Sequence, residues 1–244
     1  MISFFCISIV AVSLFAAPVP ANAFETDSIH TAEGDLKITC IGHGTLMFDY
    51  KGKIIHIDPW SQLADYSQMP KADIILLTHH HRDHLDLKAI EQIRTADTRI
   101  LLTEICAKSL DGGKVMKNGD ATTVDGIRIE AVPAYNRVHM RKPGVPFHPK
   151  GEGNGYILTF GDKRIYVAGD TENIPEMKRL TGIDVAFLPM NLPYTMTPEM
   201  AADAALALSP KILYPYHYGD TDTGKLVELL KDHPEIEVRI RHLK

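Results

Sequence analysis

The residues best suited to chemistry stand together at positions 78–84, which read Thr-His-His-His-Arg-Asp-His and follow the apolar run 74–77. Such a run predicts a buried strand, and residues two apart on the extended backbone that leaves it point the same way. Imidazole and carboxylate groups bind Zn²⁺ and also Mn²⁺, Fe or Ni²⁺. His79 and His81 could therefore share one cation, with Asp83 and His84 turned towards a second. The alternative is a solvated loop that happens to be rich in histidine.

Two later residues with similar chemistry also stand where strands end. Asp170 follows the strand-like run 164–168, and His217 follows the strand that ends at residues 214–216. Each has a plain alternative, because Asp170 could cap a helix that starts near Glu172, and His217 could be a histidine at the edge of the core. Taken singly, neither residue indicates a site.

The elements that must position these side chains come in two similar halves. Residues 133–155 form a long stretch without periodicity, and loops of that length are usually functional. Strand hairpins followed by helix–strand alternation in both halves predict an α/β fold, a four-layer αββα sandwich in a single domain. We predict strands at 36–41, 45–50, 53–58, 73–77, 99–102, 122–124, 127–132, 156–160, 164–168, 185–188, 212–214 and 236–238, and helices after Leu85, at 198–208 and at 225–231.

The stretch 78–84 matches the His-x-His-x-Asp-His signature of the metallo-β-lactamase-fold hydrolases, which this chain resembles. The resemblance is strongest to the ascorbate-phosphate lactonase-like and uncharacterised zinc-dependent hydrolases of that fold, and it also rests on residues 41–43, 57–59, 168–170 and 215–219. It implies two divalent metal ions, zinc foremost. By this resemblance the first metal is held by His79 and His81, the second by Asp83, His84 and His217, and Asp170 lies between them.

Hydrolysis is the chemistry that the resemblance implies. A hydroxide that bridges the two metals would attack a small ester, lactone or phosphoester, because a bound metal lowers the pKa of its water to about 7. Asp83 could orient this nucleophile or carry its proton. His43 and Asp58 are expected beneath the metals, where a carboxylate could orient a ligating histidine, although plain turn chemistry would also explain them. The loops 135–154 and 191–197 are expected to form the walls of the substrate pocket.

One position departs from the family pattern. A further histidine usually follows the strand before the long loop, but this chain has Asn136 there. Asn136 could ligate weakly through its amide oxygen, His148 could enter the catalytic centre from the loop, or the first site could be weak. We expect His148 or Asn136 near the metals and lower metal occupancy at the first site.

The same departure keeps a second class of function open, a binding or sensing module that holds metals without turnover. A β-lactamase is less favoured, because that branch generally has a cysteine at the position of Asp170. Flavo-diiron redox proteins use the same ligand set, but they need a flavin domain for which this chain of 244 residues has no room.

Residues 1–23 are expected to lie outside the hydrolase domain, which we place at residues 24–244. Residues 2–17 are almost wholly apolar, and an Ala-Asn-Ala site precedes Phe24. This pattern predicts a signal peptide and a periplasmic or secreted protein. Because no Lys or Arg precedes the apolar run, an uncleaved membrane anchor is the alternative.

Charge and composition limit the partners. The formal net charge is -5 and no run of Lys or Arg stands out, so we expect a small-molecule substrate and no nucleic acid. No later segment is apolar enough to span a bilayer, so no stable membrane partner is expected after cleavage. Cys40 and Cys106 are predicted to be buried thiols, with a disulfide as the alternative. The pattern predicts no oligomeric state.

Overall fold

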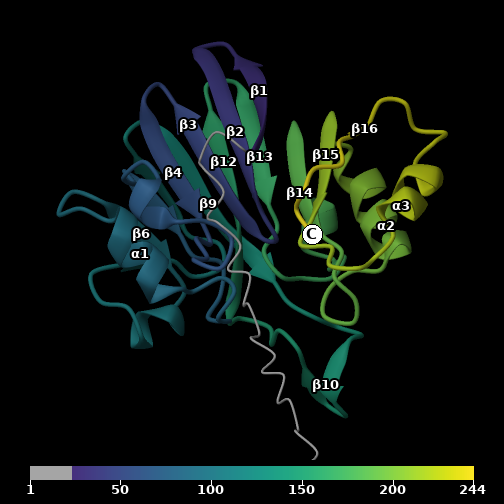
Figure 1. The fold of residues 1–244 in the computed structure, drawn as a ribbon. Helices are drawn as coiled ribbons and strands as arrows, with labels where there is room; N and C mark the ends of the chain where they lie inside the picture. The colour runs from purple at the N-terminus through teal and green to yellow at the C-terminus, as the bar shows by residue number, and fades with distance from the viewer. Residues whose placement is uncertain (1–23) are drawn as a thin grey trace, which may run out of the picture.

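The computed structural model describes residues 24–244, and the predicted signal peptide lies outside them. In this part of the chain two seven-stranded sheets pack face to face, and helices cover their outer surfaces (Figure 1). The predicted αββα fold is therefore confirmed.

The first sheet is built from strands that follow one another along the chain. Its first four strands are antiparallel and joined by hairpins, and the later ones are parallel. The strands are β1 (Glu25–Thr31), β2 (Gly34–Gly42), β3 (Thr45–Tyr50), β4 (Lys53–Ile57), β5 (Ile74–Leu76), β6 (Arg99–Leu102) and β7 (Lys114–Val115), with η2 (Tyr66–Gln68), α1 (Leu87–Ile93) and η3 (Cys106–Lys108) between them.

The second sheet repeats this plan, with antiparallel strands first and parallel strands after them. A separate small hairpin, β10 with β11, projects away from both sheets (Figure 1). The elements are β8 (Ala121–Val124), β9 (Ile127–Ala134), β10 (Met140–Lys142), β11 (Val145–Pro146), β12 (Gly153–Phe160), β13 (Lys163–Val167), η4 (Met177–Arg179), β14 (Val185–Pro189), α2 (Pro198–Leu208), β15 (Ile212–Tyr216), α3 (Thr223–Leu229) and β16 (Glu237–Val238).

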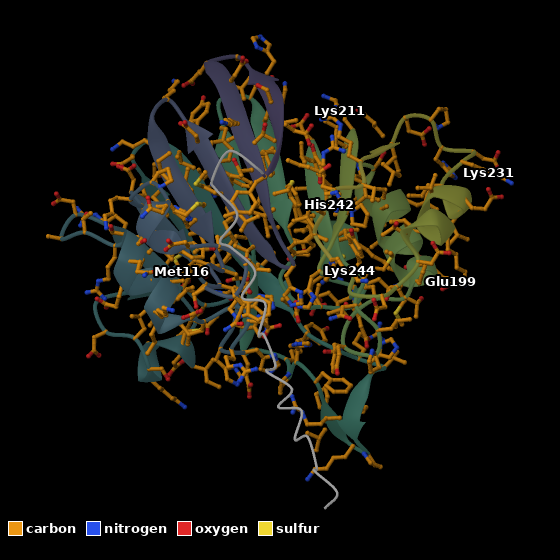
Figure 2. The ribbon with its side chains drawn as sticks, viewed as in Figure 1. Met116, Glu199, Lys211, Lys231, His242 and Lys244 are labelled. Atoms are coloured by element: carbon orange, nitrogen blue, oxygen red, sulfur yellow. The ribbon has the colours of Figure 1, made fainter. Side chains whose placement is uncertain are left out.

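Alternating side chains of the two sheets form the central core. Phe187 of β14 stacks on Tyr214 of β15 with ring centroids 4.6 Å apart, and it also contacts Phe48 of β3 in the other sheet. The opposite faces pack against α1 on one side and against α2 and α3 on the other. Charged side chains such as Lys231 lie at the outer edge of the helical layer (Figure 2). Each sheet is thus covered on both faces.

The elements missed by the pattern are the polar ones. β1 exposes or half-exposes five of its seven residues and pairs only with β2, so its sequence lacks the apolar alternation of an inner strand. The hairpin of β10 and β11 lies within the predicted loop 133–155.

Cys40 and Cys106 are free and buried, as expected. Within residues 24–244, no helix combines the length and the apolar character needed to cross a membrane.

A buried histidine in β4 predicts a pH dependence of stability. His56 is fully buried, and its Nε2 donates to the carbonyl oxygen of Pro70 at 3.1 Å. Burial lowers the pKa of His56 from 6.5 to about 4. The unfolded chain binds this proton more readily, so the stabilisation is full above about pH 6.5 and is lost as pH falls towards 4. The full loss corresponds to roughly 3 kcal/mol of unfolding free energy.

Urea unfolding at about pH 7.5 and about pH 5 measures this dependence. We expect the wild-type protein to lose more stability between these values than His56→Leu, while the exposed-site variant His30→Leu behaves like wild type. An equal loss in wild type and His56→Leu would contradict the assignment to His56.

Candidate metal centre

The predicted site residues converge at one edge of the sandwich, because each follows a strand that ends there. The stretch 78–84 follows β5, Asn136 follows β9, Asp170 follows β13, and His217 follows β15. The turn between β2 and β3 adds His43, whose carbonyl oxygen accepts a hydrogen bond from the backbone N–H of His217 at 3.0 Å. Segments from both halves of the sequence are thus joined at this edge.

One group of donor atoms comes from four residues. The Nε2 of His79 lies 3.1 Å from the Nδ1 of His81, and the Nε2 of His148 lies 3.1 Å from an oxygen of Asp170. All four donor atoms lie within 4.8 Å of one another. In a tetrahedral site with ligands about 2.1 Å from a zinc ion, neighbouring donors are about 3.4 Å apart, so this group can surround one ion. We call it the first cluster: His79, His81, His148 and Asp170.

A second group lies beside it. The Oδ2 of Asp83 is 3.6 Å from the Nε2 of His84, 3.6 Å from that of His217 and 3.0 Å from that of His43. These donor atoms also lie within 4.8 Å of one another. His43, expected beneath the metals, instead stands among the donors. We call this group the second cluster: His43, Asp83, His84 and His217.

Asp170 joins the two clusters. Its carboxylate lies 3.5 Å from the Nε2 of His84 and 3.5 Å from that of His217, in addition to its contacts in the first cluster. Three buried atoms here have no hydrogen-bond partner: the Nε2 of His84, the Nε2 of His217 and the Oδ1 of Asp170. Buried polar atoms are normally satisfied, so unpartnered donors that face one another fit residues that bind metal ions.

The charge state of the first cluster suits metal binding as well. Burial lowers the pKa of His79 well below its usual value and lowers that of His81 to about 4, so both rings are neutral. Burial acts to raise the pKa of Asp170, but the imidazoles of His217 and His84 outweigh it and hold that pKa well below its usual value. Neutral imidazole and ionised carboxylate are the forms that coordinate metal.

In the second cluster burial acts to lower the pKa of His84, but Asp170 and Asp58 outweigh it and raise that pKa to about 9. A metal ion bound there would therefore displace a proton.

Asp58 positions a histidine in each cluster. One of its oxygens accepts from the Nδ1 of His84 at 2.7 Å, which leaves the Nε2 of that ring free for the second cluster. The same carboxylate accepts the hydroxyl of Thr78 at 2.5 Å, and this hydroxyl lies 3.0 Å from the Nδ1 of His79. Asp58 therefore accepts a hydrogen bond from a ligand candidate, as expected, and through Thr78 the contact extends to the first cluster.

Asn136 does not stand among the donor atoms, as the family pattern would suggest for its position, but contacts a histidine of the first cluster. The amide oxygen of Asn136 accepts from the backbone N–H of His148 at 2.9 Å and lies 2.6 Å from its Nδ1. Because an amide oxygen only accepts, His148 carries its proton on Nδ1 and presents Nε2 to the first cluster. Asn136 thus lies behind His148, which enters from the loop.

Glu172 holds Asn136 in place, although from the sequence we expected it only as a possible helix start. Its buried carboxylate accepts from the amide of Asn136 at 3.0 Å and from the backbone N–H groups of residues 137, 138 and 139 at 2.7, 2.8 and 2.6 Å. The helix that Asp170 might have capped is not formed there, since the next described helix is η4. The density of donors around Glu172 could be recognised only in three dimensions.

Removal of the Asn136 amide is expected to weaken metal binding at the first cluster. Partners that orient a metal-binding histidine typically contribute about 10–100-fold to metal affinity. We expect Asn136→Ala to bind its weaker metal about 10–100-fold less tightly, and His148→Ala to lose that metal. Metal content by plasma mass spectrometry and competition with a chromophoric chelator measure both effects.

The control for this pair is Asn173→Ala, which removes an amide that bonds to Asp203, outside both clusters. Unchanged metal stoichiometry and affinity in both Asn136→Ala and His148→Ala would overturn the role given to His148.

Tight backbone geometry accompanies the clusters. His43, Asp58 and His217 have φ values of 51°, 46° and 45°, which side-chain-bearing residues rarely adopt. Such conformations concentrate at functional sites, where the surrounding structure holds them in place. Gly44 contributes by its lack of a side chain, because a Cβ there would lie 2.8 Å from Cε1 of His84. The second cluster therefore depends on a glycine.

A cavity of about 440 Å³ opens above the clusters. As predicted, the loops 135–154 and 191–197 contribute to its walls. Trp60, which the sequence did not indicate, packs against the ring of His43 at 5.1 Å. The lining consists of His43, Trp60, His81, Arg82, Asp83, Arg141, Phe147, His148, Asp170, Asn191, Tyr194 and His217.

Comparison with known proteins identifies the family. The sequence profile of the Beta-lactamase superfamily domain matches residues 37–217, which include all members of both clusters. The chain belongs to the beta-lactamase superfamily. Within this superfamily it belongs to the family of UPF0173 metal-dependent hydrolases, because it is more than 30% identical to members of that family over most of their length.

The relatives and a solved structure agree with this family and with the fold described above. A UPF0173 metal-dependent hydrolase from Thermococcus kodakarensis is 35% identical over 75% of this chain and 84% of its own. Another, from Pelotomaculum thermopropionicum, is 32% identical over 79% of this chain and 87% of its own. A solved structure from Parabacteroides distasonis is 55% identical, with a TM-score of 0.87, over 91% of this chain and 100% of that one.

Proposed function

We propose that this superfamily member cleaves a small ester, lactone or phosphoester with two divalent ions, zinc foremost, held by the first and second clusters. The observation that carries the proposal is Asp170, whose carboxylate reaches both clusters at the floor of the cavity. Bound ions would supply an activated water nucleophile and Lewis-acid stabilisation of the negative charge that develops on the substrate.

Asp83 is the carboxylate positioned to accept a proton from the nucleophile. Its side chain is 32% exposed and lines the cavity, and its Oδ2 accepts from the Nε2 of His43 at 3.0 Å. Burial acts to raise its pKa, but the neighbouring imidazoles of His217, 3.6 Å away, and His43, 3.0 Å away, hold that pKa far below its usual value. An ionised oxygen at this place can orient a water molecule or accept its proton. His148, with Nε2 turned into the first cluster, serves as a ligand.

The remaining cavity walls suit the organic part of a substrate. Trp60 packs beside the ring of His43, and Phe147 contacts Tyr194 edge to face with ring centroids 5.0 Å apart. Aromatic walls of this kind bind apolar groups and displace water from the reacting bond. A small substrate fits the cavity volume better than a polymer would.

The proposal is tested on protein purified without chelator. We expect two metals per chain by plasma mass spectrometry, together with hydrolysis of 4-nitrophenyl acetate, a simple lactone or bis-4-nitrophenyl phosphate. Chelation should abolish this turnover, and added Zn²⁺ should restore it. Two retained metals without turnover of any of the three substrate classes would overturn the proposal in favour of a binding or sensing module.

We further propose that residues 1–23 direct export, so that the hydrolase acts in the periplasm or outside the cell. The support comes from the apolar run and the Ala-Asn-Ala site, after which β1 begins at Glu25. Intact mass measurement of exported protein should give a chain that begins at Phe24. A chain of full length in the membrane fraction would favour an uncleaved anchor.

A further inference from the structure

Two arginines line the cavity without a negatively charged partner. Arg82 comes from the stretch between the two clusters, and Arg141 comes from β10. Within residues 24–244, neither guanidinium has a hydrogen bond to another side chain or lies within 4 Å of a carboxylate. Most of the other cationic side chains at the surface are paired, such as Lys150 with Glu176 and Lys211 with Asp184. Two unpaired guanidinium groups that face one cavity are a feature that the hydrolytic centre does not explain.

Arg141 is oriented although it is exposed. Its guanidinium lies 5.5 Å over the ring of Phe147, and Phe147 contacts Tyr194 on the opposite loop. The carbonyl oxygen of Tyr194 in turn accepts from the amide of Asn136 at 2.8 Å. A guanidinium that stacks on an aromatic face keeps its N–H edges free, and those edges match the two oxygens of a carboxylate or phosphate.

The hairpin that carries Arg141 is tied to the first cluster. It occupies the chain between Asn136 and His148, whose backbones are joined by a hydrogen bond of 2.8 Å from the N–H of Asn136 to the carbonyl oxygen of His148. Arg141 therefore projects from a loop closed at its base by the residues that complete the first cluster. The base of the loop that carries Arg141 is thus held beside the first cluster.

We propose that Arg141, with Arg82, binds an anionic group of the substrate that is separate from the bond being cleaved. The group is a carboxylate or a phosphate, which share the paired oxygens that a guanidinium recognises. The substrate is then an ester, lactone or phosphoester with a second, negatively charged end. This inference rests on the proposed hydrolytic function and specifies the substrate class of the same site.

The test compares two esters with the same leaving group. Mono-4-nitrophenyl glutarate carries a free carboxylate, and 4-nitrophenyl butyrate is neutral. For Arg141→Gln we expect the KM of the glutarate ester to rise about tenfold or more, because a charge-assisted hydrogen bond is lost, while kcat/KM of the butyrate ester changes less than about twofold. Added salt should raise the KM of the glutarate ester more in wild type than in Arg141→Gln.

Lys142→Gln is the matched control, because it removes the neighbouring cation of the same strand, which does not line the cavity. It should leave both esters unaffected. An equal effect of Arg141→Gln on the two esters, or no effect on either, would overturn the proposal. The metal content of Arg82→Gln is measured first, because Arg82 adjoins His81 and Asp83. An effect of this variant on the esters is assigned to Arg82 only when its metal content equals that of wild type.

A binding measurement separates this inference from the proposed function. Calorimetry with phenylphosphonate and with phenylacetate needs no turnover, and it distinguishes a phosphate site from a carboxylate site. We expect at least one of them to bind about tenfold more weakly to metal-loaded Arg141→Gln than to wild type. If no ester is turned over but this difference is present, hydrolysis fails and the anion site stands. If both ligands bind Arg141→Gln as they bind wild type, the anion site fails.

Discussion

Asp170→Ala is expected to remove both metals and with them all hydrolytic activity. Loss of a partner that merely orients a metal-binding histidine lowers metal affinity about 10–100-fold. Loss of a carboxylate shared by both clusters should therefore lower the metal affinity of each cluster by more than about 100-fold. The reason is geometric, since Asp170 lies 3.1 Å from His148 and 3.5 Å from His84 and His217. Metal analysis and turnover of bis-4-nitrophenyl phosphate measure the two effects together.

Asp232→Ala serves as the matched control, because it removes an exposed carboxylate far along the chain from the clusters. Asp170→Asn keeps the size of the side chain and separates ligation from packing, and circular dichroism checks that each variant is folded. A folded Asp170→Ala that retains two tightly bound metals would contradict the bridging role of this residue.

The largest effect on stability is expected from Phe187→Ala. Phe187 is fully buried and joins the two sheets through Tyr214 and Phe48. Truncation of a buried phenylalanine lowers the unfolding free energy by about 3–5 kcal/mol, because apolar contacts are lost and a cavity remains. Urea unfolding of the metal-free protein should show a lower midpoint at unchanged slope.

Leu206→Ala is the control for this change, because Leu206 is 43% exposed on α2. We expect it to lower the unfolding free energy by less than about 1 kcal/mol, as surface substitutions generally do. A loss for Phe187→Ala as small as that for Leu206→Ala would mean that the interface between the sheets is not the main source of stability.

Most of the fold could be predicted because its strands bury one or both faces. β2, β3, β12 and β14 have apolar patterns that identify them as strands. β1 could not be found in this way, since a polar edge strand has few buried positions. The hairpin of β10 and β11 is largely exposed, so its sequence carries no periodic signal.

The site was predictable to a lesser degree. The stretch 78–84, Asp170 and His217 are close in space, because each lies at a strand end. The alternatives for Asn136 and His148 stayed open, because they depend on how a loop of eleven residues returns to its start. Glu172 and Thr78 act through hydrogen bonds to residues distant in sequence, which no local pattern encodes.

The hairpin between Asn136 and His148 connects the proposed anion site with the first cluster. A histidine on a strand end would hold its metal whether or not the cavity is filled, but His148 is reached through a loop whose tip carries Arg141. An anion that steadies this loop also steadies His148, so the metal of the first cluster and the anion raise each other's affinity by the same factor. The hydrolase would then hold its full complement of metal most firmly when its substrate is present.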